Sequence, residues 1–198
     1  ARVEQSNTAW AQGGIATVMA TDDSFDSHVE DTLTAGAGLC DLPAVRTVVE
    51  SGPERMRELI EWGMRFDTKP GSSEIALGRE GGHSMSRILH SDGDATGREL
   101  QRTLIEQAKS RAGIRLFDEC FVLDLLTLDG TPPRCVGAVT HHPKYGLQVI
   151  WAKATILASG GAGQVYREST NPAVATGDGI SLAYRAGAKV ADMAFMQF

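Results

Sequence analysis

The sequence is poor in cysteine and contains no long apolar run. Its three cysteines, Cys40, Cys120 and Cys135, are odd in number, far apart and in no Cys-x-x-Cys pair. This pattern favours reduced core thiols in a cytoplasmic protein over a disulfide framework. No apolar stretch reaches the ~18 residues of a membrane-spanning helix, and residues 1–5 lack the apolar run of a signal peptide. We therefore expect no membrane partner.

An excess of basic residues is also lacking. Lys and Arg number 19 against 25 Asp and Glu, giving a formal net charge of −6, and no basic stripe occurs. Nucleic acid is therefore not an expected partner. The five histidines match no zinc spacing and have no cysteine beside them, so no metal site is predicted. His28 is expected on the solvent-facing side of its helix.

Glycine, in contrast, is abundant at 22 of 198 residues, above the usual share of roughly 7%. There is no collagen period, and the glycines form small groups: Gly13-Gly14, 36–38, Gly81-Gly82, 160–163 and 177–179. Such groups are typical of turns in which the backbone adopts positive φ or lies flat against a ligand.

The apolar spacing predicts helices and strands that alternate along the chain. Helices are predicted at 25–33, Pro43–Val49 and Asp178–Ala188. Another helix is predicted from Pro53 to Gly63, with Ser51 as its N-cap. A further helix is predicted to begin with a capping box formed by Thr96 and Glu99. Short strands are predicted at 74–77, 87–90, 114–117, 121–128, 135–140, 147–151, 153–158 and 189–192. This order predicts an α/β domain with an inserted antiparallel β-meander.

The most informative local string is Ser6-Asn7-Thr8-Ala9-Trp10-Ala11-Gln12-Gly13-Gly14-Ile15-Ala16. Its small residues and paired glycines would let backbone N–H groups approach a flat ring, while its hydroxyl and amide groups could bind phosphate oxygens. From composition alone, a surface loop explains the string equally well.

This string resembles the second flavin-binding segment of the succinate dehydrogenase, fumarate reductase and L-aspartate oxidase family. Further strings with the same resemblance follow in order: Asp26–Thr32, Ala35–Gly38, Arg79–Ser84, Asp94–Arg98, Ala158–Gly161, Thr170–Pro172 and Gly177–Gly179. Each is weak alone, but together they cover nearly the whole chain and point to the L-aspartate oxidases within the family.

The resemblance implies a FAD/NAD(P)-binding Rossmann-like fold with the small antiparallel β-meander inserted. The family begins with a strand and a Gly-x-Gly-x-x-Gly turn, which this sequence lacks, so the first βαβ unit is expected to be missing. Residues 1–192 are then a partial FAD-binding domain, and 193–198 begin a substrate-capping domain. The chain opens without Met and closes on an apolar stretch, so we expect a piece of a longer protein, with its catalytic arginine beyond Phe198.

The resemblance also implies the residues that contact FAD. The loop along the pyrophosphate and flavin ring would comprise Asn7, Thr8, Ala9, Trp10, Ala11, Gln12, Gly13 and Gly14. Phe121 and Val122 would contact the adenine through their backbone, and Ser159 and Gly160 would form the turn beside the dinucleotide. Asp178 would lie near the cofactor, unless it only stabilises a helix start by ~0.3–1 kcal/mol. Asn7 stands where covalently flavinylated relatives have histidine, which implies non-covalent FAD.

For the substrate, the resemblance implicates Glu80, with His83 beside it. A carboxylate facing the ammonium of aspartate would form a charge-assisted bond worth ~1.5–3 kcal/mol and would disfavour succinate. The alternative for Glu80 is a solvated charge on a hairpin.

The expected activity is oxidation of L-aspartate to iminoaspartate by hydride transfer to FAD, which oxygen or fumarate then reoxidises. This is the first step toward quinolinate and NAD, with quinolinate synthase as an expected partner. A fumarate reductase or succinate dehydrogenase flavoprotein, or a non-catalytic nucleotide-binding module, are the alternatives.

Overall fold

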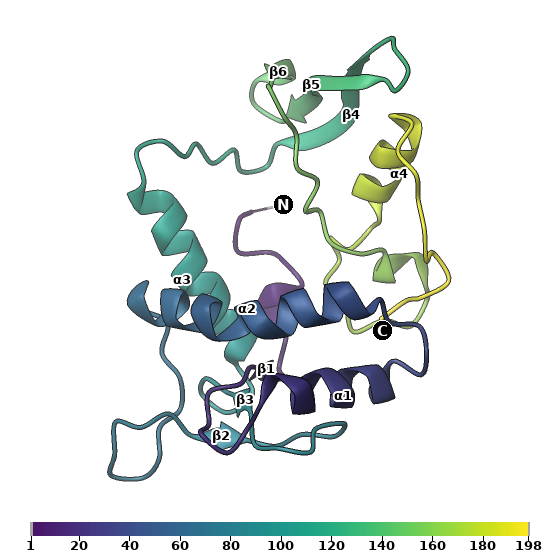
Figure 1. Cartoon of the computed structure of the whole chain (residues 1–198). Helices are drawn as coiled ribbons and strands as arrows, with labels where there is room; N and C mark the ends of the chain where they lie inside the picture. Colours follow the sequence, from purple (N-terminus) through teal and green to yellow (C-terminus); the bar gives the residue numbers. More distant parts are fainter. Residues whose placement is uncertain (1, 198) are drawn as a thin grey trace. The chain divides into compact units, whose positions relative to one another are not determined.

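The computed structural model describes residues 2–197 of the chain, so Ala1 and Phe198 lie outside the described residues (Figure 1). The predicted start of a further domain at 193–198 therefore ends on a residue that is not described. The chain forms two compact units. We call Thr8–Ile114 the helical unit, and Ala1–Asn7 together with Arg115–Phe198 the sheet unit.

The helical unit contains three α-helices and a small antiparallel sheet. Its elements are η1 (Thr8–Trp10), β1 (Ile15–Ala16), α1 (Phe25–Ala35), α2 (Leu42–Glu61), β2 (Leu77–Gly78), β3 (Ile88–Leu89) and α3 (Thr96–Ser110). The strand order is β1-β3-β2, with Leu89 opposite both Ile15 and Leu77. Ile88 and Leu89 are fully buried, so the central strand is the core of this sheet.

Helices α1 and α2 pack against each other (Figure 1). The Ser24 hydroxyl caps α1 by accepting from the Ser27 N–H at 3.2 Å, and α1 ends at Gly36 as predicted. The prediction of two helices across 43–63 is wrong, because α2 runs unbroken through Pro53. A proline inside a helix removes one intrahelical hydrogen bond, but this ring is buried on one face together with Val49 and Met56, which offsets that loss.

The start of α3 also differs from its prediction. Ala95 is the N-cap and has no side-chain cap, so the Thr96–Glu99 capping box is wrong. Instead, the Gly97 N–H donates to the Ala11 carbonyl at 3.0 Å. A Cβ on Gly97 would lie 2.0 Å from the Thr8 carbonyl oxygen, so only glycine lets η1 sit this close to α3.

The sheet unit contains the predicted β-meander. Strands β4 (Phe121–Leu128), β5 (Arg134–His142) and β6 (Gly146–Trp151) form an antiparallel sheet in the order β4-β5-β6. Short helix η2 (Gly163–Val165) and helix α4 (Asp178–Arg185) follow. The mixed α/β fold with small antiparallel sheets is therefore confirmed.

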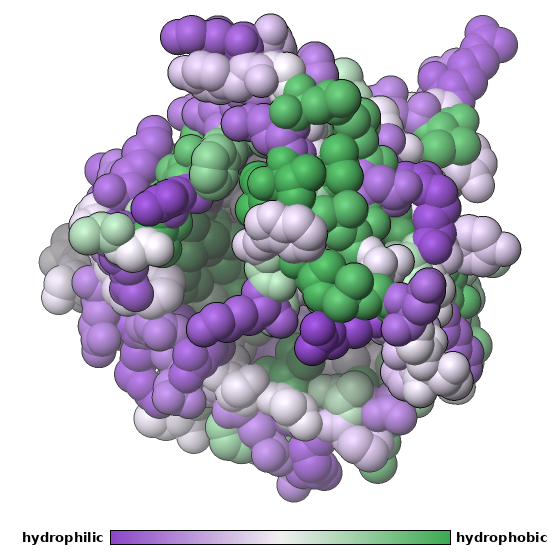
Figure 2. Space-filling view, turned by 90° about the horizontal axis from the view of Figure 1, so that it is seen from above, coloured by the Kyte–Doolittle hydropathy of each residue, from purple (hydrophilic) through white to green (hydrophobic). Residues whose placement is uncertain are grey.

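Three predicted strands, at 114–117, 153–158 and 189–192, are wrong, because these segments are irregular. A strand needs a neighbour to satisfy its backbone groups, and no described strand pairs with these segments. The side chain of Ile156 is 90% exposed as a result. Figure 2 shows exposed apolar side chains of this kind, in green, grouped among hydrophilic ones.

Glu99 joins α3 to the chain that follows α2. Its buried carboxylate accepts from the Arg102 guanidinium at 2.7 Å, and from the backbone N–H and side-chain Nε of Arg65, both at 3.1 Å. The hydrogen bonds from Arg102, followed by those from Arg65, lower the pKa of Glu99 to about 2.

Replacing Glu99 with Gln should remove part of the acid sensitivity of the fold. Because the folded-state pKa lies below the ordinary 4.5, the carboxylate contributes stability that is present above about pH 4.5 and lost as the pH falls toward 2. Over that range the free energy of unfolding should fall by on the order of 2–3 kcal/mol more in the unsubstituted protein than in Glu99→Gln. Urea unfolding at several pH values measures how the free energy of unfolding of each of the two proteins depends on pH.

The matched control is Glu58→Gln, which removes an exposed carboxylate paired with Arg55 at 2.8 Å. Its pH dependence should follow that of the unsubstituted protein. If Glu99→Gln also gives a parallel curve, the assignment of this acid sensitivity to Glu99 is incorrect.

Candidate functional site

The Glu80 carboxylate lies at the centre of the candidate site in the helical unit. It occupies the loop between β2 and β3, and its Oε1 is 2.7 Å from Nε2 of His90. The backbone N–H of Gly14 also donates to it. The His90 hydrogen bond, with that of Gly14, lowers the pKa of Glu80, so this carboxylate is ionised at neutral pH. Its side chain remains 48% exposed and is therefore accessible to a cationic ligand group.

His90 follows β3 and is surrounded by glycine backbone. A Cβ on Gly14 would lie 2.9 Å from His90 Nε2, and a Cβ on Gly78 would lie 3.1 Å from His90 Cε1. A side chain at position 14 would therefore displace the ring from Glu80, and one at position 78 would require a small shift of the ring. The sequence does not identify His90 as a site residue, because no local pattern indicates which residue meets Glu80.

The predicted flavin loop from Thr8 to Gly14 also belongs to the helical unit. The Ala11 N–H donates to the Thr8 carbonyl at 3.2 Å, and the Gln12 amide donates to Asp94 Oδ2 at 3.4 Å. Trp10 is exposed, and nothing lies within 4 Å of a Cβ placed on Gly13. The loop is thus held from one side by α3 and keeps open backbone at Gly13.

Asn7 lies in the sheet unit, where its amide donates to the Asn171 side-chain oxygen at 2.5 Å. Asn171 in turn donates to the carbonyl of Gln197 at 2.8 Å. The side chain of Asn7 is therefore already part of a hydrogen-bonded chain, and its orientation is restrained by Asn171.

Ser159, Gly160 and Asp178 gather at the start of α4 in the sheet unit. A Cβ on Gly179 would lie 1.7 Å from Ser159 Oγ, so the turn packs directly on the helix. Ser159, Gly160 and Gly179 help to line a cavity of 490 Å³. The Asp178 carboxylate accepts from the Thr176 hydroxyl. These predicted residues lie close together, with glycine backbone exposed to the cavity.

Phe121 and Val122 open β4, where they pair with His141 and Thr140 of β5. The side chain of Phe121 is exposed. The strand position predicted for these two residues is therefore correct, while their contact with adenine stays a prediction.

His83 lies against α1. Its ring centroid is 5.7 Å from that of His28, and Nδ1 of both rings is buried without a hydrogen-bond partner. The expectation that His28 faces solvent is wrong, because only 7% of it is exposed. Burial, followed by the nearby Arg87 and His83, lowers the pKa of His28, so its ring is neutral at pH 7.

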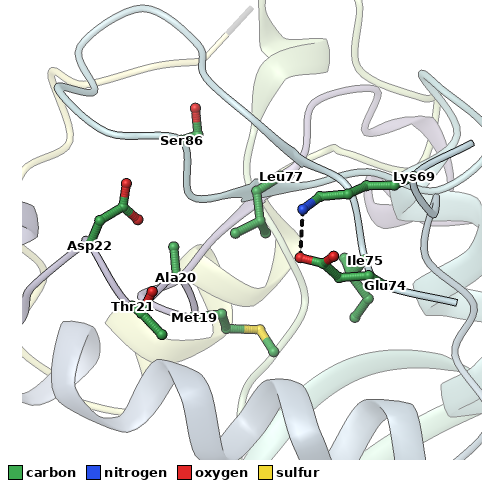
Figure 3. Close-up of a pocket in the computed structure, with 9 residues that line it drawn as sticks. All are labelled: Met19, Ala20, Thr21, Asp22, Lys69, Glu74, Ile75, Leu77 and Ser86. Carbon is green, nitrogen blue, oxygen red and sulfur yellow. Dashed lines mark hydrogen bonds and ion pairs between the residues drawn. The ribbon is translucent and has the colours of Figure 1, made fainter. Parts of the chain in front are cut away.

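A separate cavity of 680 Å³ lies elsewhere in the helical unit (Figure 3). Figure 3 shows Lys69 and Glu74 pointing toward one another, with 2.5 Å between Nζ and Oε1. Met19–Asp22, Ile75, Leu77 and Ser86 complete the lining. No predicted site residue lines this cavity, so its volume alone does not connect it with the candidate site.

Residues 2–197 contain no group of three or more His, Cys, Asp or Glu side chains placed to hold a metal ion. Within the same residues, no helix is both long enough and apolar enough to cross a membrane.

Comparison with known proteins identifies relatives over the whole chain. The family described as FAD binding domain matches residues 1–198. The chain is 46% identical over 202 residues to the L-aspartate oxidase of Streptomyces coelicolor, covering 100% of this chain and 34% of that protein. It is 44% identical over 196 residues to the L-aspartate oxidase of Bacillus subtilis, covering 99% of this chain and 36% of that protein.

Among solved structures, a mutated E. coli quinol fumarate reductase is similar with a TM-score of 0.86 and 36% identity, covering 92% of this chain and 30% of that chain. The chain spans about a third of the length of the curated relatives it matches.

Adjacent glycines in the flavin loop should respond differently to substitution by alanine. A methyl group on Gly14 would lie 2.2 Å from Ile88 Cγ2 and 2.7 Å from the Leu89 carbonyl oxygen. We expect Gly14→Ala to lower the free energy of unfolding by about 1–3 kcal/mol through this overpacking. Gly13→Ala meets nothing within 4 Å and should stay within about 0.5 kcal/mol of the unsubstituted protein. Denaturant unfolding measures both, and equal losses would contradict the close approach of Gly14 to β3.

Proposed function

This chain belongs to the FAD binding domain family, and on that premise we propose that the complete protein oxidises L-aspartate to iminoaspartate with FAD. The observation on which this rests is the placement of Glu80, whose ionised carboxylate lies against Gly14 of the flavin loop and remains partly open to solvent. The names of the relatives, which match this chain over 99–100% of its length, support the same activity.

The residues present fit FAD in both units. In the helical unit, Gly13 leaves room for a flat ring beside its backbone, and Thr8 to Gln12 complete that loop. In the sheet unit, Ser159 and Gly160 line a cavity with exposed glycine backbone. Asn7, Phe121, Val122 and Asp178 are the further residues that we propose contact the cofactor. When bound, FAD supplies the acceptor for the hydride.

Asn7 supports non-covalent attachment of the cofactor. Its amide is not a nucleophile, and it is engaged with Asn171. The protein therefore has no imidazole at this position with which to form a covalent bond to the flavin.

Glu80 provides the specificity that we propose for aspartate. Its carboxylate would accept hydrogen bonds from the substrate ammonium, and His90 and Gly14 hold that carboxylate in its anionic form. A dicarboxylate without the ammonium would leave this negative charge unpaired, which disfavours succinate. His83, in the same loop, is proposed as a second substrate contact.

The proposed architecture is a Rossmann-like FAD-binding domain at 1–192 that is completed by a first βαβ unit, with a substrate-capping domain from 193 onward that contains the catalytic arginine. The unpaired segment at 153–158, in which Ile156 is 90% exposed, supports a missing neighbouring strand. The greater length of the relatives is in accord with this proposal.

The same proposal implies an electron acceptor for the reduced flavin and an enzyme that uses iminoaspartate. Either oxygen or fumarate would reoxidise the flavin, and the similarity to a fumarate reductase structure favours including fumarate. Because imines hydrolyse in water, an enzyme such as quinolinate synthase would need to use the product promptly. The three free cysteines support a cytoplasmic location.

A fumarate reductase or succinate dehydrogenase flavoprotein is the second candidate, and the structural similarity at a TM-score of 0.86 is the observation in its favour. The position of Glu80 separates the two candidates, because neither succinate nor fumarate has an ammonium group for this carboxylate.

Anaerobic mixing of the complete FAD-loaded protein with L-aspartate should bleach the flavin absorbance, because the hydride acceptor becomes reduced. Succinate should bleach it poorly, since it leaves Glu80 unpaired. Stopped-flow absorbance measures both rates. Equal bleaching by succinate favours the second candidate, and no bleaching by either compound favours a non-catalytic nucleotide-binding module.

Glu80→Gln should reduce kcat/KM for aspartate by roughly ten- to a hundredfold, because a charged partner of the ammonium is worth ~1.5–3 kcal/mol. Fumarate reduction, which involves no ammonium, should change much less. Glu74→Gln is the matched control, since its carboxylate is also exposed and pairs only with Lys69 among the described ion pairs. If kcat/KM falls equally for aspartate and fumarate, Glu80 acts in general catalysis or in structure. If kcat/KM falls for neither, Glu80 is a solvated charge on a hairpin.

A further inference from the structure

The loop that contains Glu80 has no regular structure of its own. It turns at Gly81 and Gly82, where Gly82 adopts φ +82°. Within the turn, the His83 N–H donates to the Glu80 carbonyl at 3.3 Å. Besides this bond and the contacts of the Glu80 carboxylate with His90 and Gly14, the loop is held by contacts of Ser84 with helix α1.

Ser84, in the middle of the loop, is bound twice to one residue of helix α1. Its backbone N–H and its hydroxyl donate to Asp31 Oδ2 at 2.8 and 2.9 Å. The Ser84 N–H is the main cause that lowers the pKa of the Asp31 carboxyl, so this group is ionised and both bonds are charge-assisted.

The same Asp31 oxygen also accepts from Arg87 Nη1 at 2.6 Å. Ser84 and Arg87 both lie between Glu80 and His90 in the sequence, so Asp31 fixes the middle of the segment whose two ends meet. Arg87 has a second partner in Asp23, which accepts from it twice, at 2.7 and 2.8 Å. A neutral residue at position 31 would therefore leave the buried guanidinium paired.

We propose that Asp31 is a positioning residue for substrate recognition, which holds Ser84 and Arg87 on α1 and thereby keeps Glu80 in contact with Gly14 and His90. This inference rests on the proposed function, because it assigns to Asp31 an effect on aspartate that is transmitted through Glu80. The described hydrogen bonds of the Asp31 carboxylate go to Ser84 and Arg87, so its proposed effect on the substrate is indirect.

The test compares Asp31→Asn with the unsubstituted protein, using the complete FAD-loaded polypeptide. We expect kcat/KM for L-aspartate to fall about tenfold or more, because a small displacement of a binding group has large effects on rate. Fumarate reduction should fall much less. Amide hydrogen exchange of the peptide that contains Ser84 should accelerate, and this readout does not depend on activity.

A double-mutant cycle separates positioning from a general loss of structure. If Asp31 acts through Glu80, adding Asp31→Asn to Glu80→Gln should cause little further loss for aspartate. The matched control is Asp26→Asn, which removes an exposed carboxylate from the same helix, where it pairs with Arg46 at 3.0 Å. This control should leave kcat/KM and Ser84 exchange unchanged.

Three results would overturn the inference. The first is that Asp31→Asn and Glu80→Gln lower kcat/KM for aspartate additively, and the second is that Asp31→Asn lowers kcat/KM equally for aspartate and fumarate. The third is that amide hydrogen exchange of the Ser84 peptide is unchanged in Asp31→Asn. If Asp31→Asn does not fold with FAD, Ser84→Ala decides, since it removes the hydroxyl bond to Asp31 and the hydroxyl contact with Ser27 at 3.2 Å but keeps the backbone bond to Asp31. An aspartate-specific loss of about threefold would then support the inference, and no loss would overturn it. Failure of the unsubstituted protein to oxidise aspartate would instead contradict the proposed function, while Ser84 exchange would still report on the Asp31 contact.

Discussion

A fully buried guanidinium, that of Arg87, determines how the helical unit is assembled. A buried charge without partners is costly, so Arg87 requires the two carboxylates of Asp23 and Asp31 to lie where they do. Asp31 belongs to α1 and Arg87 immediately precedes β3, so this one ion-pair cluster joins the helix to the central strand. The Glu80 loop connects to the same cluster through Ser84.

The position of β3 in turn determines the candidate site. Its buried residues Ile88 and Leu89 occupy the space that a side chain at position 14 would need. The flavin loop can therefore lie against the strand only with a glycine at this position. His90 follows directly and meets Glu80. The flavin loop is held from its other side by α3, whose Gly97 N–H donates to Ala11. The anionic group proposed to recognise the substrate thus lies beside the loop proposed to contact the flavin because both are packed around the same short strand.

Much of this arrangement can be predicted from the sequence, because it depends on local order. The flavin loop and Glu80 fall within strings whose order and spacing resemble one family, and the meander at 121–151 is predicted by the alternation of apolar residues along its strands. The errors have a common cause in contacts that are distant in sequence. Pro53 continues a helix because its ring is buried, and Glu99 binds Arg65, 34 residues away, instead of capping α3. The partnership of Asp31 with Ser84, 53 residues away, has no local signature either.

The most direct test is a crystal structure of the complete protein with FAD and α-methylaspartate, which retains the ammonium group but has no hydrogen on the α-carbon to transfer. Recognition of the substrate by Glu80 predicts the ammonium nitrogen about 2.7–2.9 Å from a Glu80 carboxylate oxygen, with Ser84 still bound to Asp31. An ammonium directed away from Glu80, with the carboxylate facing only solvent, would contradict it.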